Sequence, residues 1–138
     1  MPKRKDKKIN SGQVIIPADH PNPPEPHEID IARVLARYFK CSAEFLIPID
    51  DYKRKTADIV MLGVEWEIKS PTGNSKSTIG NQFHAASRQS KYIVIDTRRT
   101  SLEYDRIEKT VLLEMKKRIG IKKVILINKT TEVVEIIR

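Results

Sequence analysis

Apolar residues recur at every third or fourth position between residues 27 and 40, a spacing that predicts an amphipathic helix. Pro26 suits the first turn of this helix, where its missing N–H costs no hydrogen bond. Glu28 suits the same turn, because its negative charge complements the positive end of the helix dipole. The stripe that is expected to face the core contains Ile31, Leu35, Tyr38 and Phe39.

Shorter apolar runs, several of them alternating with polar residues, predict strands along the rest of the chain. They cover residues 43–49, 57–62, 64–69, 92–96, 124–127 and 133–137. Helical spacing returns over residues 77–89 and 102–119, and Gly120 is expected to end the second of these helices. The first of them turns Ile79, Phe83 and Ala86 inward.

From residue 26 onward the elements follow the order helix, three strands, helix, strand, helix and two strands. Strands and helices interspersed in this way predict an α/β fold, in which a mixed β-sheet is flanked by helices. The run 92–96 is mostly apolar, which is typical of a strand buried on both faces. The short connection at residues 128–130 predicts that the last two strands form a C-terminal β-hairpin.

The first 25 residues differ in composition from the rest of the chain. Residues 2–8 form a basic run, and four prolines between residues 21 and 26 disfavour regular structure. We therefore expect a basic, Pro-rich tail or linker over residues 1–25 and one domain over residues 26–138. The apolar residues 14–16 are expected to lie on that domain as an edge segment. A second interpretation makes the basic run an electrostatic arm for nucleic acid.

The balance of charge narrows the class of partner. The 138 residues include 26 Lys and Arg against 18 Asp and Glu, a formal net charge of +8. This charge favours anionic partners, with nucleic acid first and acidic membrane surfaces second. The single Cys41 excludes an intrachain disulfide framework and a Cys-rich zinc site. No apolar run approaches the roughly 20 residues that span a bilayer, so we expect a cytoplasmic site of action.

The turn around Gly63 predicts a pair of opposed carboxylates. If Leu62 and Gly63 form a two-residue turn, Asp58 lies directly across the hairpin from Glu67. Like charges in that position destabilise a sheet, so the pair favours a cation between them. Mg²⁺ and Mn²⁺ are the natural candidates, since both prefer oxygen ligands. A register shifted by one pair would put Glu65 in the place of Glu67.

Lys69 lies two residues beyond Glu67 and so shares its face of the strand. The opposite face carries the residues expected in the core, Val64, Trp66 and Ile68. An ammonium beside two carboxylates and a metal can orient a water and stabilise charge on a phosphate. Asp58, Glu67 and Lys69 therefore supply the groups needed for metal-assisted hydrolysis of a phosphodiester. The alternative is a solvated strand face on which charges happen to alternate.

These residues resemble the PD-(D/E)XK nuclease superfamily, whose core runs helix, three strands, helix, strand. The resemblance covers residues 26–96 and implies a restriction-endonuclease-like αβββαβ core with an added helix and a C-terminal hairpin. It implies that Asp58 and Glu67 bind the metal and that Lys69 is catalytic. In many members a Glu on the first helix completes the site, a position that Glu28 matches. The alternative for Glu28 is simple complementarity to the helix dipole.

A narrower resemblance covers residues 67–97, which include the stretches EIKSPTG and GNQFHAASRQSKYIVID. They look like the C-terminal tRNase domains of contact-dependent growth-inhibition toxins. The resemblance implies cleavage of tRNA, a divalent metal cofactor, an immunity protein as a partner and delivery as part of a larger secreted protein. Because the chain begins with Met1, it is either excised from such a protein or a stand-alone relative, whose substrate could be DNA.

Polar residues after Lys69 are candidates for contacts with nucleic acid, because a polar Gly-containing loop and basic side chains suit a phosphate backbone. The candidates are Thr72, Lys76, Gln82, His84 and Arg88. His84 has a second interpretation as an ordinary surface or packing residue. Arg98 and Arg99, after the apolar strand, either hold phosphate or are simply solvated. Two functions compete with a tRNase: a DNA endonuclease with the same core, and a basic module that binds nucleic acid without cleaving it.

Overall fold

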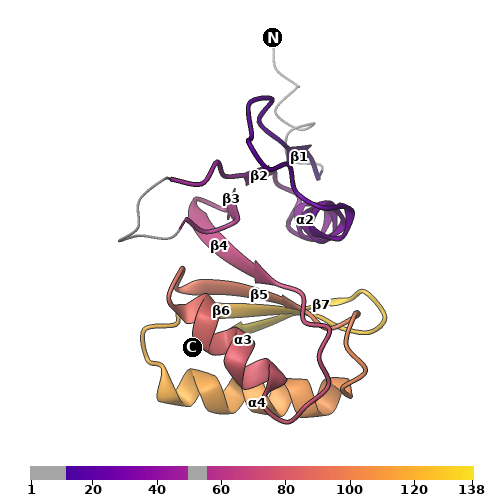
Figure 1. Ribbon diagram of the computed structural model, residues 1–138, viewed down its shortest axis with the longest axis vertical. Coiled ribbons are helices and arrows are strands. Elements are labelled where there is room, and N and C mark those ends of the chain that lie inside the picture. The colour runs from indigo at the N-terminus through magenta and orange to yellow at the C-terminus, as the bar shows by residue number, and fades with distance from the viewer. Residues whose placement is uncertain (1–11, 50–55) are drawn as a thin grey trace. The chain divides into compact units, whose positions relative to one another are not determined.

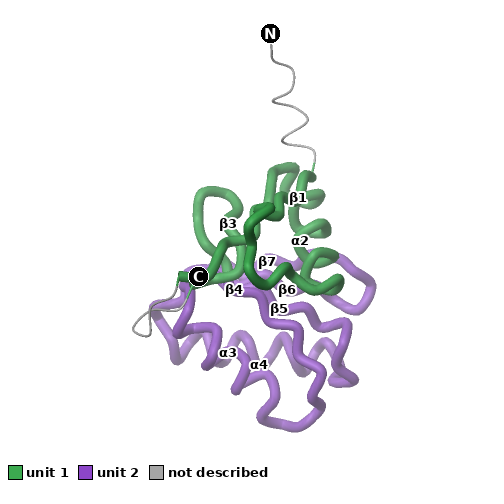
Figure 2. Tube along the Cα trace, turned by 45° about the horizontal axis from the view of Figure 1, so that its top comes forward, with its two compact units in different colours: residues 1–66 green, residues 67–138 purple. Residues whose placement is uncertain are grey.

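The computed structural model describes residues 12–49 and 56–138 (Figure 1). Residues 1–11, which include the basic run 2–8, and residues 50–55 lie outside the described residues. The chain divides into two compact units, unit 1 from Met1 to Trp66 and unit 2 from Glu67 to Arg138 (Figure 2). Within the described ranges, no helix is both long enough and apolar enough to cross a membrane.

The helices and strands confirm the expected α/β class, a mixed sheet flanked by helices. In chain order they are β1 (Val14–Ile15), α2 (Pro26–Phe39), β2 (Ala43–Phe45), β3 (Ile59–Met61), β4 (Val64–Lys69), α3 (Thr78–Ser87), β5 (Tyr92–Asp96), α4 (Tyr104–Lys117), β6 (Lys123–Ile127) and β7 (Val133–Ile137). Neighbouring strands in the chain are hydrogen-bonded neighbours throughout, so the strand order is β1 to β7. From α2 onward the order of elements is the one that the periodicity predicts.

Unit 1 begins with a strand pair that brings the N-terminal segment onto the fold. β1 pairs in parallel with β2, so the apolar stretch at residues 14–16 supplies an edge strand, as expected. α2 buries one face, with Ile31, Ala32, Leu35 and Ala36 fully covered. Tyr38 is a correction, because its side chain is 47% exposed rather than inward. Its ring packs edge-to-face on Phe39 at 4.8 Å between centroids.

The hairpin of β3 and β4 has the register that the sequence predicts. Ile59 pairs with Trp66, and Met61 pairs with Val64 across the two-residue turn. Leu62 and Gly63 both have positive φ, 56° and 78°, as a type I′ turn requires. The indole Nε1 of Trp66 donates to the Met61 carbonyl at 2.9 Å inside the core. Turn geometry and one buried hydrogen bond therefore fix this register together.

Unit 2 packs two helices on one face of its strands. Its part of β4, Glu67–Lys69, runs parallel to β5, β5 runs parallel to β6, and β7 returns antiparallel. α3 and α4 lie on the same side of β5, β6 and β7 (Figure 1). The core between them is continuous and consists of Ile79, Phe83, Ala86, Ile93, Ile95, Leu102, Ile107, Val111, Met115, Ile121, Val124 and Leu126. The three α3 residues in this core are the ones expected to point inward.

Several element ends differ from those predicted. β2 stops at Phe45 rather than at residue 49. Pro48 lies between these two positions and has no N–H to donate to a neighbouring strand. α4 ends at Lys117, three residues before Gly120. The reason is a distant side chain: Arg138 donates to the carbonyls of Met115 and Arg118 at the end of α4. A glycine in left-handed conformation is therefore not needed there, and among the described glycines only Gly12 and Gly63 have positive φ.

Substitutions at the two residues of the β3–β4 turn are expected to change the free energy of unfolding in opposite directions. Gly63→Ala is expected to lower the free energy of unfolding by about 1 kcal/mol, because an L residue at positive φ is strained. A Cβ at Gly63 would meet no atom within 4 Å, so the backbone alone carries this cost. Leu62→Asn is expected to raise the free energy by about 0.5–1 kcal/mol, since Asn tolerates this conformation and Asn-Gly favours the turn. Urea unfolding of both variants measures the effects, and changes of the same sign would contradict the turn assignment.

Candidate functional site

Unit 1 contains a cavity of ≈ 160 Å³ that Glu28 and Asp58 line together. Glu28 comes from the first turn of α2, and Asp58 directly precedes β3. The remaining lining residues are His20, Asn22, Pro24, Phe45, Leu46, Pro48, Thr56 and Ala57. Two acidic residues that the sequence singles out for different reasons thus share one cavity.

Glu28 has a structural role as well as a place in the cavity. Its Oε1 accepts a hydrogen bond from the backbone N–H of Glu25 at 2.8 Å, which caps the start of α2. Helix starts leave such N–H groups without intrahelical partners, and an acidic side chain in the first turn also suits the dipole. The helix-end interpretation of Glu28 is therefore correct, and it coexists with a carboxylate on the cavity wall.

Asp58 is held by its backbone on both sides. Its N–H donates to the Trp66 carbonyl at 3.0 Å, and its own carbonyl accepts from the Leu46 N–H at 2.9 Å. The bond to Leu46 extends the β2–β3 register by one residue beyond Ile59, whereas the bond to Trp66 departs from the β3–β4 register, in which Trp66 is the partner of Ile59. Asp58 is half-buried, and its backbone is fixed by hydrogen bonds to the chain on both sides.

His20 is a cavity residue that the sequence did not reveal. Its Nδ1 accepts from the Asn22 N–H at 3.2 Å, so Nε2 carries the proton and donates to the Leu46 carbonyl at 3.0 Å. Both ring nitrogens are thereby used in holding residues 20–22 against the end of β2. A single His in a Pro-rich segment gives no periodic signal, and only the contact with Leu46 reveals it.

Two of the residues that line the cavity, Glu28 and Asp58, are acidic. Carboxylate oxygens are the ligands that Mg²⁺ and Mn²⁺ prefer, so the donor chemistry of these two residues suits a hard cation. Mg²⁺ in particular is commonly held by one or two carboxylates while it keeps several waters. In residues 12–49 and 56–138, no three His, Cys, Asp or Glu side chains form a ready-made metal cluster.

Glu67 and Lys69 form an ion pair in unit 2. Lys69 Nζ lies 3.4 Å from Glu67 Oε2, and Glu67 is only 3% exposed. Glu67 is aligned with Ile93, and Lys69 with Ile95, in the parallel ladder to β5, so all four side chains lie on one sheet face. That is the face that α3 and α4 cover. Glu65, the alternative for a shifted register, is exposed and pairs with Val60.

The four residues of the expected active site thus fall into two pairs. Glu28 and Asp58 share a cavity of unit 1, and Glu67 and Lys69 share an ion pair of unit 2. A single site built from all four residues, including the Asp58–Glu67 opposition, stays a prediction.

The candidates for nucleic-acid contacts are spread over unit 2. Thr72 is exposed in the loop after β4, and Lys76 lines a small cavity of ≈ 20 Å³ with Arg106 and Thr110. On α3, Gln82 is half-buried, whereas His84 and Arg88 are exposed. Helical geometry puts Gln82 and His84 about 160° apart around the α3 axis, so these two do not form one binding group.

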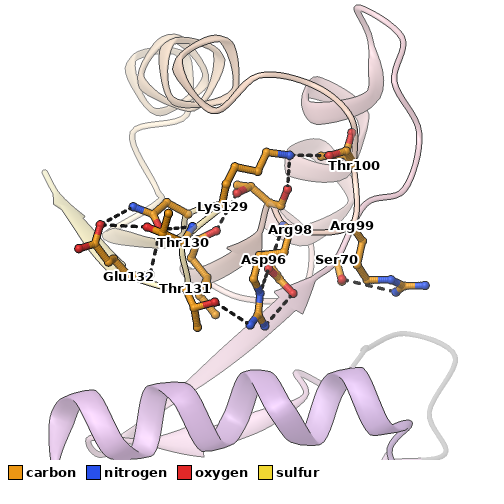
Figure 3. Close-up of polar contacts among 12 residues, drawn as sticks. Ser70, Asp96, Arg98, Arg99, Thr100, Lys129, Thr130, Thr131 and Glu132 are labelled. Atoms are coloured by element: carbon orange, nitrogen blue, oxygen red, sulfur yellow. Dashed lines mark hydrogen bonds and ion pairs between the residues drawn. The ribbon is translucent and has the colours of Figure 1, made fainter.

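Three loops meet at the edge where β4, β5 and β6 end (Figure 3). The loop after β4 is joined to the segment after β5 by Thr100, whose hydroxyl donates to the Gly73 carbonyl at 2.5 Å. The turn after β6 is joined to the same segment by Lys129, whose ammonium donates to the carbonyls of Thr97, at 2.6 Å, and Thr100. Side-chain hydrogen bonds thus join the three loops at this edge.

Asp96 and Arg98 form the most buried ion pair of that edge. The Asp96 carboxylate, 1% exposed, accepts from Arg98 Nε at 2.8 Å, from Nη2 at 3.2 Å and from the Arg98 N–H at 3.1 Å. Arg98 Nη1 also donates to Thr131 in the turn after β6, at 3.4 Å. Arg98 is therefore bound to the protein itself and not merely solvated.

Arg98→Ala is expected to lower the free energy of unfolding by about 1–3 kcal/mol, because Asp96 would remain buried without its cation. The neighbouring Arg99 is exposed, so Arg99→Ala is expected to change stability by less than about 0.5 kcal/mol. Urea unfolding of the two variants side by side is the measurement. Equal small effects would show that the buried carboxylate does not depend on Arg98.

Comparison with known proteins agrees with this arrangement of elements. A family model described as the contact-dependent growth inhibition CdiA C-terminal domain matches residues 55–133, more than half of the chain. Asp58, Glu67 and Lys69 lie within the matched segment, whereas His20 and Glu28 precede it. A search of curated proteins found no match.

A solved structure is similar over almost the whole chain. It is a chain of a CdiA-CT/CdiI toxin and immunity complex from Burkholderia pseudomallei, with a TM-score of 0.63 and 18% sequence identity. The similarity covers 89% of this chain and 98% of that chain, and at this identity it shows a shared fold. From the match of the family model, the chain belongs to the family of contact-dependent growth inhibition CdiA C-terminal domains.

Proposed function

We propose that this toxin-family domain is a metal-dependent endonuclease that hydrolyses phosphodiester bonds, with tRNA as the favoured substrate. The observation that carries the proposal is the shared cavity of Glu28 and Asp58, two acids that the nuclease motif selects independently. The ion pair of Glu67 with Lys69 supplies the other half of the motif. The net charge of +8 supports an anionic polymer as substrate. Cleavage of nucleic acid damages a cell, as is expected of a toxin domain of this family.

In this proposal each residue has one role, in the pattern of the PD-(D/E)XK superfamily. Asp58 and Glu67 would hold a divalent ion, Mg²⁺ or Mn²⁺, and Glu28 would support it directly or through water. When bound, such an ion supplies Lewis acidity toward a phosphate oxygen and an attacking water. The Lys69 ammonium would orient a water and would neutralise the negative charge that develops on the phosphate. The Lys69 side chain is 22% exposed, so it is not fully buried with Glu67.

The proposal includes a protein partner and a way in which the domain is delivered to a target cell. The similar Burkholderia chain is part of a toxin and immunity complex, so we propose that an immunity protein blocks this domain as well. The matching family describes the C-terminal domain of a larger protein, which supports delivery as part of a secreted chain and action in the cytoplasm of the target cell.

Cleavage assays test the reaction and choose the substrate. Labelled total tRNA and plasmid DNA are incubated with Mg²⁺, Mn²⁺ or EDTA and with wild type, Lys69→Ala or Glu67→Gln. We expect cleavage of tRNA in either metal, none in EDTA, and a loss of at least about a hundredfold in both variants. Glu65→Gln is the matched control, because Glu65 is an exposed acid on the same strand; it is expected to retain activity.

Each other outcome has a definite meaning. Metal-dependent cleavage of plasmid alone would replace tRNA by DNA as the substrate. Shifts in a binding gel without cleavage of either polymer would favour the non-catalytic module. Loss of activity in Glu65→Gln but not in Glu67→Gln would move the proposed metal ligand by one pair.

Metal binding is also testable without turnover. Mg²⁺ or Mn²⁺ at a concentration of about 100 times Kd would stabilise the fold by about 2.7 kcal/mol, because the ion binds the folded state. We therefore expect the Tm of wild type to rise with added metal, and to rise much less for Asp58→Asn and Glu28→Gln. An equal rise in all three proteins would place the ion elsewhere.

A further inference from the structure

Arg98 and Arg99 are adjacent in sequence but have opposite environments. Arg98 is bound to the buried Asp96 through three hydrogen bonds, so its guanidinium is part of the fold. Arg99 is exposed, and within the described part of the chain its guanidinium makes one hydrogen bond, from Nη1 to Ser70 Oγ at 3.4 Å. A guanidinium has five N–H donors, so most of those of Arg99 face solvent.

The backbone on both sides of Arg99 is fixed by hydrogen bonds to other segments (Figure 3). On its N-terminal side, the Thr97 N–H and hydroxyl both donate to the Ile127 carbonyl, at 3.0 and 2.8 Å. On its C-terminal side, Thr100 is 4% exposed and its hydroxyl donates to Gly73. The ammonium of Lys129 bonds the carbonyls of both threonines and so bridges the segment that carries Arg99. The backbone of this segment would therefore lose little further entropy when the side chain of Arg99 binds a ligand.

Arg99 is also directed toward the strand that carries the proposed catalytic lysine. Its partner Ser70 directly follows Lys69, and β4 and β5 are parallel, so their carboxyl ends meet at one sheet edge. Ligands of α/β sheets bind outside the carboxyl ends of parallel strands. A guanidinium at that edge can donate two parallel hydrogen bonds to a phosphate, which an ammonium cannot do.

We infer that Arg99 binds a phosphate group of the nucleic acid beside Lys69, and that Asp96, Arg98 and Lys129 are positioning residues that hold Arg99 there. This inference rests on the proposed nuclease function, whose substrate it places at the carboxyl edge of β4 and β5. It assigns different roles to two arginines that the sequence alone does not distinguish.

Binding of labelled total tRNA in EDTA tests the inference without turnover. The parent protein is Lys69→Ala, which leaves the substrate intact, and Arg99→Ala, Arg99→Lys and Lys91→Ala are each added to it. Lys91 is the matched control, an exposed cation that precedes β5 at the opposite end of the strand. Kd is measured by fluorescence anisotropy over a range of salt concentrations, and urea unfolding shows that each variant is folded.

Arg99→Ala is expected to weaken binding by about tenfold or more, and to reduce the slope of log Kd against log salt by about one. Arg99→Lys is expected to lie between parent and Arg99→Ala, because the charge remains and the planar fork is lost. Lys91→Ala is expected to change Kd by less than about twofold, since an isolated surface cation contributes little. Equal effects of Arg99→Ala and Lys91→Ala would overturn the inference, as would a parent that does not bind tRNA.

The result separates this inference from the nuclease proposal. If wild type cleaves tRNA and Arg99→Ala binds like its parent, the nuclease function stands and the role of Arg99 is wrong. If wild type cleaves neither polymer and Arg99→Ala loses affinity, Arg99 binds phosphate in a protein that does not cut. In wild-type background, a raised KM with a nearly unchanged kcat would confirm binding as the role of Arg99.

Discussion

The register of the β3–β4 hairpin determines the face of the sheet on which each side chain of β3 and β4 lies. Residues alternate between the two faces of a strand, so a slip of one residue would move every side chain to the opposite face of the sheet. The turn at Leu62–Gly63 and the bond from Trp66 to Met61 hold the register. Trp66 is buried and Glu65 exposed as a result. The same alternation, continued along β4, gives Glu67 and Lys69 a common face.

The parts of the fold that local patterns encode were predictable. Helical and period-two spacing identified the elements of both units, and the two-residue turn gave the register within unit 1. Element ends were less predictable where distant groups decide them. At the end of α4 the carbonyls of Met115 and Arg118 accept hydrogen bonds from Arg138, and no feature of residues 115–120 predicts that contact. Tyr38 lies on the expected stripe, yet the last turn of α2 leaves it exposed.

The candidate site was predictable to a different degree for each residue. Asp58, Glu67 and Lys69 carry a motif with defined spacing, and Glu28 carries a helix-start signal. The structure describes them as two pairs, Glu28 with Asp58 in unit 1 and Glu67 with Lys69 in unit 2, and no pattern in the sequence predicted this pairing. His20 could not be found from sequence, because its role follows from a bond to a carbonyl 26 residues away. The difference between Arg98 and Arg99 likewise depends on which of them reaches Asp96.

The interlocking of three loops at the carboxyl edge of unit 2 has a consequence for how such domains diversify. The loop after β4, the segment after β5 and the turn after β6 share hydrogen bonds through Thr100, Lys129 and Arg98. An insertion in any one of them would break bonds made by the other two. Surface loops normally change length independently, but these three are constrained to vary as a set. A change in the shape of this edge would therefore require coordinated substitutions in all three segments rather than the replacement of one loop.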